Sequence, residues 1–173
     1  MQPAAGIHPI RTTILRIDPS GAVFTSAHAL LPRLCLLAGD FAGAFPVLDK
    51  DVFHFPTMTV KAAEASADPL SPYLCSFHEN SCNYIHSASG LTAKLEYQDH
   101  MRYYLHGAMC YMALKDWDRA LLFLEVVMMS PTTNIASQLQ VQAYKKWVLV
   151  SLLRHGQVCN IRIEIDLYLT DAR

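Results

Sequence analysis

The sequence predicts an all-α fold built as a stack of antiparallel helix hairpins. Three observations indicate this fold. Apolar residues recur at helical spacing over residues 93–155, a short aspartate–aromatic motif occurs twice, and only two residues connect two of the expected helices. Of the 173 residues, 52% are hydrophobic and 17% are charged, which favours a buried core and argues against disorder.

Residues 1–56 are expected to form helices with breaks. Pro46 lies within an apolar segment, and a proline inside a helix removes a backbone donor and costs about 3 kcal/mol or more. We therefore predict a short or kinked helix around Pro46. Pro32 raises the same question for the preceding helix, in which it lies.

Residues 57–92 are rich in Ser, Ala, Pro and Asn and show no steady periodicity, so we expect a loop-rich, variable insertion. This segment holds two cysteines and two histidines, residue types that suit zinc. Their spacing fits no common zinc finger, in which a longer separator lets two ligand pairs converge. We therefore predict a variable loop and no cofactor, with a weak candidate metal set of Cys75, His78, Cys82 and His86.

Residues 93–155 carry the strongest helical pattern. Asp116 offers a side-chain oxygen to the first N–H groups of a new helix, and Ser130-Pro131 ends that helix. A third helix is expected near Asn134 to Arg154, with last turns that are apolar nearly all round, as in a helix packed on two sides. One stripe of the first helix comprises Met101, Tyr104, Leu105, Ala108, Met109 and Met112, and the second helix presents Trp117, Ala120, Leu121, Leu124, Val127 and Met128.

The order of aromatic and small residues in this region is close to the tetratricopeptide pattern, with the final Pro131 one residue early. Small side chains at Ala108 and Ala120 let the two helix axes approach closely. The predicted fold is therefore a right-handed superhelical, tetratricopeptide-like stack. The residues expected to carry its packing are Tyr104, Ala108, Tyr111, Trp117, Ala120 and Leu124.

A second copy of the motif lies upstream. The run 40–44, Asp-Phe-Ala-Gly-Ala, resembles the run 116–120, Asp-Trp-Asp-Arg-Ala. With no gap, Leu48 then aligns with Leu124, and Asp49 aligns with Glu125. Two copies, each after a Leu- or Met-rich helix, predict at least two helical hairpins.

The C-terminal residues change character. Residues 161–169 alternate apolar and polar side chains, which is the pattern of a strand. We therefore divide the chain into a helical-repeat domain, residues 1–156 with the insertion 57–92, and an atypical tail, residues 157–173, that is not native solenoid sequence.

Charge and composition argue against several classes of partner. The formal net charge is −1, so no strong field attracts nucleic acid or an anionic membrane. No apolar run approaches the roughly 20 residues of a membrane span, and the N-terminus has no secretory pattern. The odd number of cysteines, 5, favours a reducing compartment.

No catalytic motif stands out. His106 and Cys110 are i, i+4 neighbours and could form a nucleophile pair, with His100 nearby, but a thiol in mid-helix is typical of packing. Cys35 among leucines is expected to be a small core residue. The methionines of the helical stripes are interpreted as core filling rather than a pliable groove.

Several strings in the chain resemble one family. These are residues 111–125, then Ser130-Pro131, then residues 142–153 with the specific run Tyr-Lys-Lys-Trp-Val-Leu-Val-Ser at 144–151. Upstream, residues 25–31, 34–38 and 44–49 follow in the same order. Together they are similar to the third-subunit family of the COP-type signalosome.

The resemblance implies a non-catalytic scaffold within a complex that removes the ubiquitin-like modifier Nedd8 from cullin-RING ubiquitin ligases. It implies other signalosome subunits as direct partners, action in nucleus and cytoplasm, and peptidase chemistry in a different, metal-binding subunit. The chain is expected to be a helical-repeat fragment without the family's winged-helix (PCI) part. The alternative is a related helical-repeat/PCI subunit of the proteasome lid or of a translation initiation factor complex.

Overall fold

The computed structural model describes residues 2–56, 81–85, 89–131 and 137–156. The regular secondary structure in these ranges is helical, apart from one isolated parallel β-bridge between Val23 and His54. The predicted all-α class is therefore confirmed. The elements are α1 (Ala4–Ile17), α2 (Ser26–Ala38), the 3-10 helix η1 (Phe41–Ala44), α3 (Phe45–Leu48), α6 (Ser81–Tyr84), α7 (Tyr97–Ala113), α8 (Trp117–Met129) and α9 (Gln138–His155).

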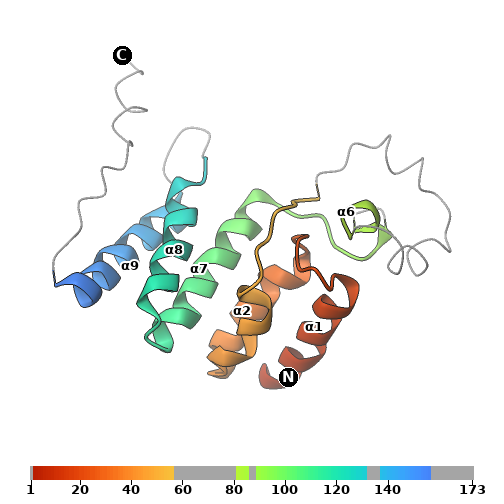
Figure 1. Cartoon of the computed structure of the whole chain (residues 1–173), viewed down its shortest axis with the longest axis horizontal. Coiled ribbons are helices and arrows are strands. Elements are labelled where there is room, and N and C mark those ends of the chain that lie inside the picture. The colour runs from red at the N-terminus through yellow and green to blue at the C-terminus, as the bar shows by residue number, and fades with distance from the viewer. Residues whose placement is uncertain (1, 57–80, 86–88, 132–136, 157–173) are drawn as a thin grey trace, which may run out of the picture.

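The helices stack in a row (Figure 1). α1 packs on α2, α2 on α7, α7 on α8, and α8 on α9, while η1 lies against α2 and α7. Each inner helix thus has a neighbour on two sides. Sequential hairpins that contact mainly their neighbours are the arrangement of a helical repeat. The right-handed sense of the superhelix stays a prediction.

Aspartate caps start the second helix of both hairpins. The side chain of Asp116 accepts a hydrogen bond from the backbone N–H of Arg119 at 3.3 Å, and that of Asp40 accepts one from Gly43 at 3.2 Å. The predicted cap at Asp116 is confirmed, and the aligned aspartate does the same upstream. α7 and α8 are joined by residues 114–116, one residue more than expected, and Lys115 takes a left-handed φ of 63° in this turn.

The two proline predictions have different outcomes. Around Pro46 the chain forms only the four-residue η1 and the four-residue α3, so the short helix is confirmed. α2 instead runs unbroken through Pro32. Pro32 is buried among neighbouring helices, and this packing offsets the lost backbone bond. α9 begins later than expected, at Gln138, because Ser137 and Gln140 form a capping box there; residues 132–136 lie outside the described ranges.

The crossing of α7 and α8 is close. Ala108 and Ala120 are completely buried there. A Cβ added to Gly107 would lie 2.8 Å from the ring of Phe123 and 3.0 Å from a methyl of Leu48, so Gly107 also marks the close approach. The core around this crossing comprises Leu48, Met101, Tyr103, Leu105, Ala108, Cys110, Tyr111, Ala120, Leu124 and Val127.

Burial on α7 is wider than the single predicted stripe. Tyr103 is fully buried, whereas Tyr104 on the predicted stripe is only half-buried. Met109 and Met112 are also half-buried. The reason is that α7 contacts α2 on one side and α8 on the other, so residues of two faces enter the core.

We expect Ala120→Leu to lower the free energy of unfolding by about 1–3 kcal/mol, because added atoms must push α7 and α8 apart. Chemical denaturation followed by circular dichroism measures this loss. The matched control is Ala113→Leu, at an exposed position near the end of α7, which should leave stability unchanged. Equal stability of the two variants would contradict the tight crossing.

The carboxylate of Asp18 holds the loop after α1 to α6. It accepts hydrogen bonds from the backbone N–H of Val23 and the hydroxyl of Ser81, both at 2.8 Å, and from the hydroxyl of Ser20. Burial raises the pKa of Asp18, but these hydrogen bonds outweigh it and hold the pKa below its usual value. The carboxylate therefore stays ionised.

The insertion leaves and rejoins the stack at one loop. On the outgoing side, the N–H of Phe24 donates to the carbonyl of His54 at 2.8 Å. On the returning side, the hydroxyl of Tyr84 donates to the carbonyl of Ile17 at 2.6 Å, beside the bond of Ser81 to Asp18. Residues 57–80 and 86–88 of the predicted insertion lie outside the described ranges.

Candidate interaction surfaces

The predicted packing residues lie along the α7–α8 hairpin. Ala108, Tyr111, Ala120 and Leu124 are buried, and Tyr104 and Trp117 are half-buried. The hydroxyl of Tyr111 also takes part in a polar contact between hairpins. The sequence pattern alone assigned it only a packing position.

Two carboxylates each link one hairpin to the next helix of the stack. Asp49 accepts a hydrogen bond from the hydroxyl of Tyr111 on α7 at 2.7 Å, and Glu125 on α8 accepts one from the indole N–H of Trp147 on α9 at 3.3 Å. These two acids occupy aligned positions in the two motif copies. The internal repeat therefore extends beyond helices to a repeated acid–aromatic hydrogen bond.

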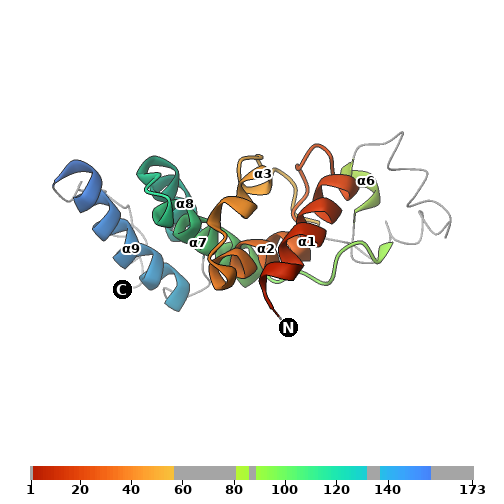
Figure 2. The same ribbon diagram turned by 90° about the horizontal axis from the view of Figure 1, so that it is seen from below.

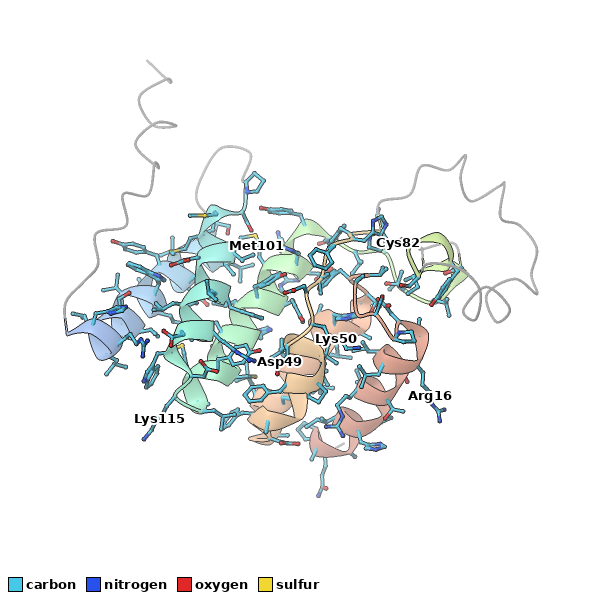
Figure 3. The ribbon with its side chains drawn as sticks, viewed as in Figure 1. Arg16, Asp49, Lys50, Cys82, Met101 and Lys115 are labelled. Atoms are coloured by element: carbon cyan, nitrogen blue, oxygen red, sulfur yellow. The ribbon has the colours of Figure 1, made fainter. Side chains whose placement is uncertain are left out.

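Arg119 completes the first of these contacts. Its guanidinium pairs with Asp49 and lies over the ring of Tyr111, 5.6 Å from the ring centre. Figure 3 shows Asp49 beside α7 and α8. Burial and the bond to Asp49 both raise the pKa of Tyr111, so its hydroxyl stays protonated and donates.

We expect Tyr111→Phe to lower the free energy of unfolding by about 1 kcal/mol, since the ring is kept and only the hydrogen bond to Asp49 is lost. A double-mutant cycle with Asp49→Ala should give a coupling energy of about 0.5–1.5 kcal/mol. The matched control is Tyr144→Phe, because Tyr144 is half exposed on α9. A coupling near zero would mean that the bond contributes nothing.

The surroundings of His106 and Cys110 favour a protonated thiol. The thiol of Cys110 is buried and donates to the carbonyl of Pro32 at 3.8 Å. Burial, with a smaller contribution from Cys35, raises the pKa of Cys110 to about 12, so the thiol is protonated at neutral pH. Burial, Arg33 and Arg102 lower the pKa of His106. Cys35 is fully buried, as expected for a core residue.

The zinc candidates fall mostly outside the described residues. Only Cys82 of the four is described, and it is half-buried on α6 (Figure 3). In the ranges that the structure covers, three or more His, Cys, Asp or Glu side chains do not gather where they could hold a metal. The metal candidate therefore stays a prediction.

α9 lies at one end of the row of helices (Figure 2), and among the described residues its outer side is left largely exposed. Its inner side buries Ala143, Trp147 and Val150 against the stack. Its outer side exposes large apolar residues, and the packing on two sides that we expected is not found among the described residues. The exposed side chains are Val141, Tyr144, Leu149, Leu152 and Leu153.

A second surface is a groove of about 520 Å³ between residues 52–55 and the start of α7. Phe24 forms its base, stacked on Phe55 with ring centres 5.5 Å apart and edge-on to His100 at 5.8 Å. Burial lowers the pKa of His100, which favours a neutral ring. Phe53 at the rim is 82% exposed, although its N–H is bound to the carbonyl of Ala22.

None of the helices described is both long and apolar enough to cross a membrane. The features that the described residues offer to a partner are hairpin contacts, an open helix face and an aromatic groove.

Comparison with known proteins gives one family. A family model for the N-terminal helical repeats of COP9 signalosome complex subunit 3 matches residues 1–163. COP9 signalosome complex subunit 3 of Emericella nidulans is 42% identical over 160 residues, which are 92% of this chain and 31% of that protein. The Neurospora crassa protein of the same description is 26% identical over 155 residues, 89% of this chain and 30% of that protein. The chain thus spans less than a third of these relatives, and no solved structure matches.

Proposed function

Because the chain belongs to the family of COP9 signalosome complex subunit 3, N-terminal helical repeats, we propose that it is a scaffold segment of the signalosome. In this proposal it performs no chemistry itself and binds other signalosome subunits. It thereby supports the removal of Nedd8 from cullin-RING ubiquitin ligases, in nucleus and cytoplasm.

The observation that carries the proposal is the family match over residues 1–163. The packing supports it, since stacked hairpins form a rigid support with open faces for partners. The protonated thiol of Cys110 also speaks against a cysteine hydrolase. A lid or initiation-factor subunit is not retained as an alternative, because the 42% identity is to a signalosome subunit.

Co-purification tests this function. We expect an affinity-tagged chain, expressed in Emericella nidulans, to recover signalosome subunits identified by mass spectrometry. A tagged helical-repeat protein of similar size from another family is the control. Enrichment of proteasome-lid or initiation-factor subunits, or of no signalosome subunit above the control, would refute the proposal.

A further inference from the structure

The aromatic groove is bordered by residues 52–55, a segment with one open edge. His54 uses both of its main-chain groups on the other edge: its N–H donates to the carbonyl of Ala22 at 2.9 Å, and its carbonyl accepts the N–H of Phe24 at 2.8 Å. Successive residues of a β-ladder direct their main-chain groups to opposite edges. The main-chain groups of Phe55 therefore point away from Ala22, and they bond to no described residue. This edge is free to pair with a further strand.

The two walls of the groove suit an extended segment. One wall is the segment 52–55, and the other is the start of α7, with Leu95, Tyr97 and His100. Phe53 on the first wall is 82% exposed and Tyr97 on the second is 43% exposed, so both offer apolar surface to a bound chain. A strand between the walls would pair its backbone with the first wall and place alternate side chains against the second. Sheet edges bind peptides in this way.

The C-terminal tail of the chain contains a sequence of the matching kind. Residues 161–169 alternate apolar and polar side chains, with Ile or Leu at each odd position. As a strand, this run would place its apolar side chains on one face and Arg162, Glu164 and Asp166 on the other. The apolar face would then cover the groove, and the charged face would stay in water.

Two charges at the rim of the groove are opposite in sign to those of the run. Asp51 is exposed just before the first wall, and Lys94 is exposed just before Leu95 on the second. Neither has an ion pair with a described residue, whereas the nearby Glu96 caps α7. A strand in the groove can bring Arg162 towards Asp51 and its two acids towards Lys94, which favours this occupant.

The groove and the start of the tail lie at opposite ends of the stack. Because α7 and α9 both run antiparallel to α8, α9 ends far from the start of α7 (Figure 1). α7 has 17 residues, so its ends are about 25 Å apart. Residues 157–160 span about 14 Å at most. The whole run can therefore enter only the groove of a second copy, and two copies in opposite directions fill both grooves at once.

We propose that residues 161–169 of one chain fill the aromatic groove of a second copy as an added strand, so that the chain forms a dimer. The apolar side chains of the run contact Phe53 and Tyr97, and its backbone pairs with the open edge at Phe55. The inference does not rest on the proposed function, because it needs no signalosome subunit other than this chain.

Sedimentation velocity of the whole chain over a range of concentrations tests the dimer. We expect reversible dimers whose dissociation constant rises about 30-fold or more in Ile163→Lys with Ile165→Lys, because two lysines replace apolar contacts in the groove. Phe53→Lys should have the same effect from the groove side. Since Phe53 is 82% exposed, its replacement leaves the core intact, and circular dichroism confirms that each variant folds.

Matched controls add lysine elsewhere. Leu37→Lys replaces a side chain on α2 that is 65% exposed and does not line the groove. Thr170→Lys with Ala172→Lys adds two charges after the run. Both variants should dimerise as the unchanged chain does, and a loss of dimers in all variants alike would overturn the assigned contact.

Mixing two variants tests the contact between run and groove directly. The Phe53→Lys chain keeps its run, and the chain with Ile163→Lys and Ile165→Lys keeps its groove, so each supplies what the other lacks. We expect the fluorescently labelled Phe53→Lys chain to bind the double variant saturably, although neither variant dimerises at the same concentration. This binding should be weaker than the original dimer, because one of two contacts remains. Absence of saturable binding would overturn the inference.

Other modes of association give distinct results. Dimers that persist in Phe53→Lys but are lost in Leu153→Lys, at a position 67% exposed on α9, would assign the second copy to the outer side of α9. A chain that stays monomeric at every concentration would show that the run does not fill the groove of a second copy. Either result overturns the inference. Neither affects the proposed function, which co-purification tests separately.

Discussion

Tyr103→Ala is expected to lower the free energy of unfolding by about 3–5 kcal/mol, because it removes a fully buried aromatic side chain. The ring of Tyr103 lies 5.4 Å from that of Phe24, 6.0 Å from His28 and 6.5 Å from Phe123. It thus joins the loop before α2, α2 itself and α8 around α7. Denaturant titration of the two proteins measures the loss.

Tyr103→Phe separates the ring from its hydroxyl. The hydroxyl of Tyr103 is buried without a hydrogen-bond partner among the described residues, and burial raises its pKa. Because an unpaired buried hydroxyl is unfavourable, we expect Tyr103→Phe to leave stability unchanged or to increase it by up to about 1 kcal/mol. A clear loss in Tyr103→Phe would show that the hydroxyl is paired, and a small loss in Tyr103→Ala would contradict the role of the ring.

Acidification should destabilise the chain through His28. Burial lowers the pKa of His28 from 6.5 to about 4; Asp18 opposes this shift, and Lys50 adds to it. Between pH 6.5 and 4 the unfolded chain binds this proton more readily than the folded chain does. Neutral His28 therefore makes its full contribution to the free energy of unfolding above pH 6.5. As the pH falls towards 4, this contribution is lost, and the free energy of unfolding decreases by about 3 kcal/mol.

His28→Asn tests the assignment. The ring nitrogen Nδ1 of His28 accepts the backbone N–H of Thr25 at 3.2 Å, and an asparagine oxygen can take that place without titrating. We expect a less stable protein at pH 7 whose stability falls less steeply down to pH 4. A residual slope should remain, because burial also lowers the pKa of His100 and His106. His155→Asn, at an exposed position, should keep the full slope; a full slope in His28→Asn would be contrary to our assignment.

Local rules predicted the local features of this fold. The cap at Asp116, the stop at Ser130-Pro131 and the break around Pro46 each depend on a few neighbouring residues, and the structure contains all three. The doubt that a helix could continue through Pro32 was wrong. α2 contains Pro32, because packing against other helices offsets the cost of a proline inside the helix. A rule that uses only neighbouring residues cannot include packing between helices.

Features that depend on distant residues were missed. Tyr103 and Gly107 enter the core because α7 has neighbours on two sides, whereas a single stripe assumes one. The bond of Ser81 to Asp18 joins residues 63 positions apart and leaves no periodic signal. The alignment of Asp49 with Glu125 was visible in the sequence, but their aromatic partners on the next hairpin were not.

The candidate surface was only partly predictable. The apolar last turns of α9 were recognised and interpreted as packed on two sides, yet no sequence pattern says whether a second side is covered. The aromatic groove was missed altogether, since Phe24, Phe55 and His100 come from three separate segments.

The anchoring of the chain at both ends of residues 57–80 has a practical consequence. Because His54 and Ser81 are both hydrogen-bonded to the loop between α1 and α2, the two ends of this stretch are held close to each other by the helical stack. Evolution can therefore lengthen or shorten that stretch cheaply, since loop closure costs little more for each added residue. The same stretch is a natural place to graft an epitope or a fluorescent reporter into the protein.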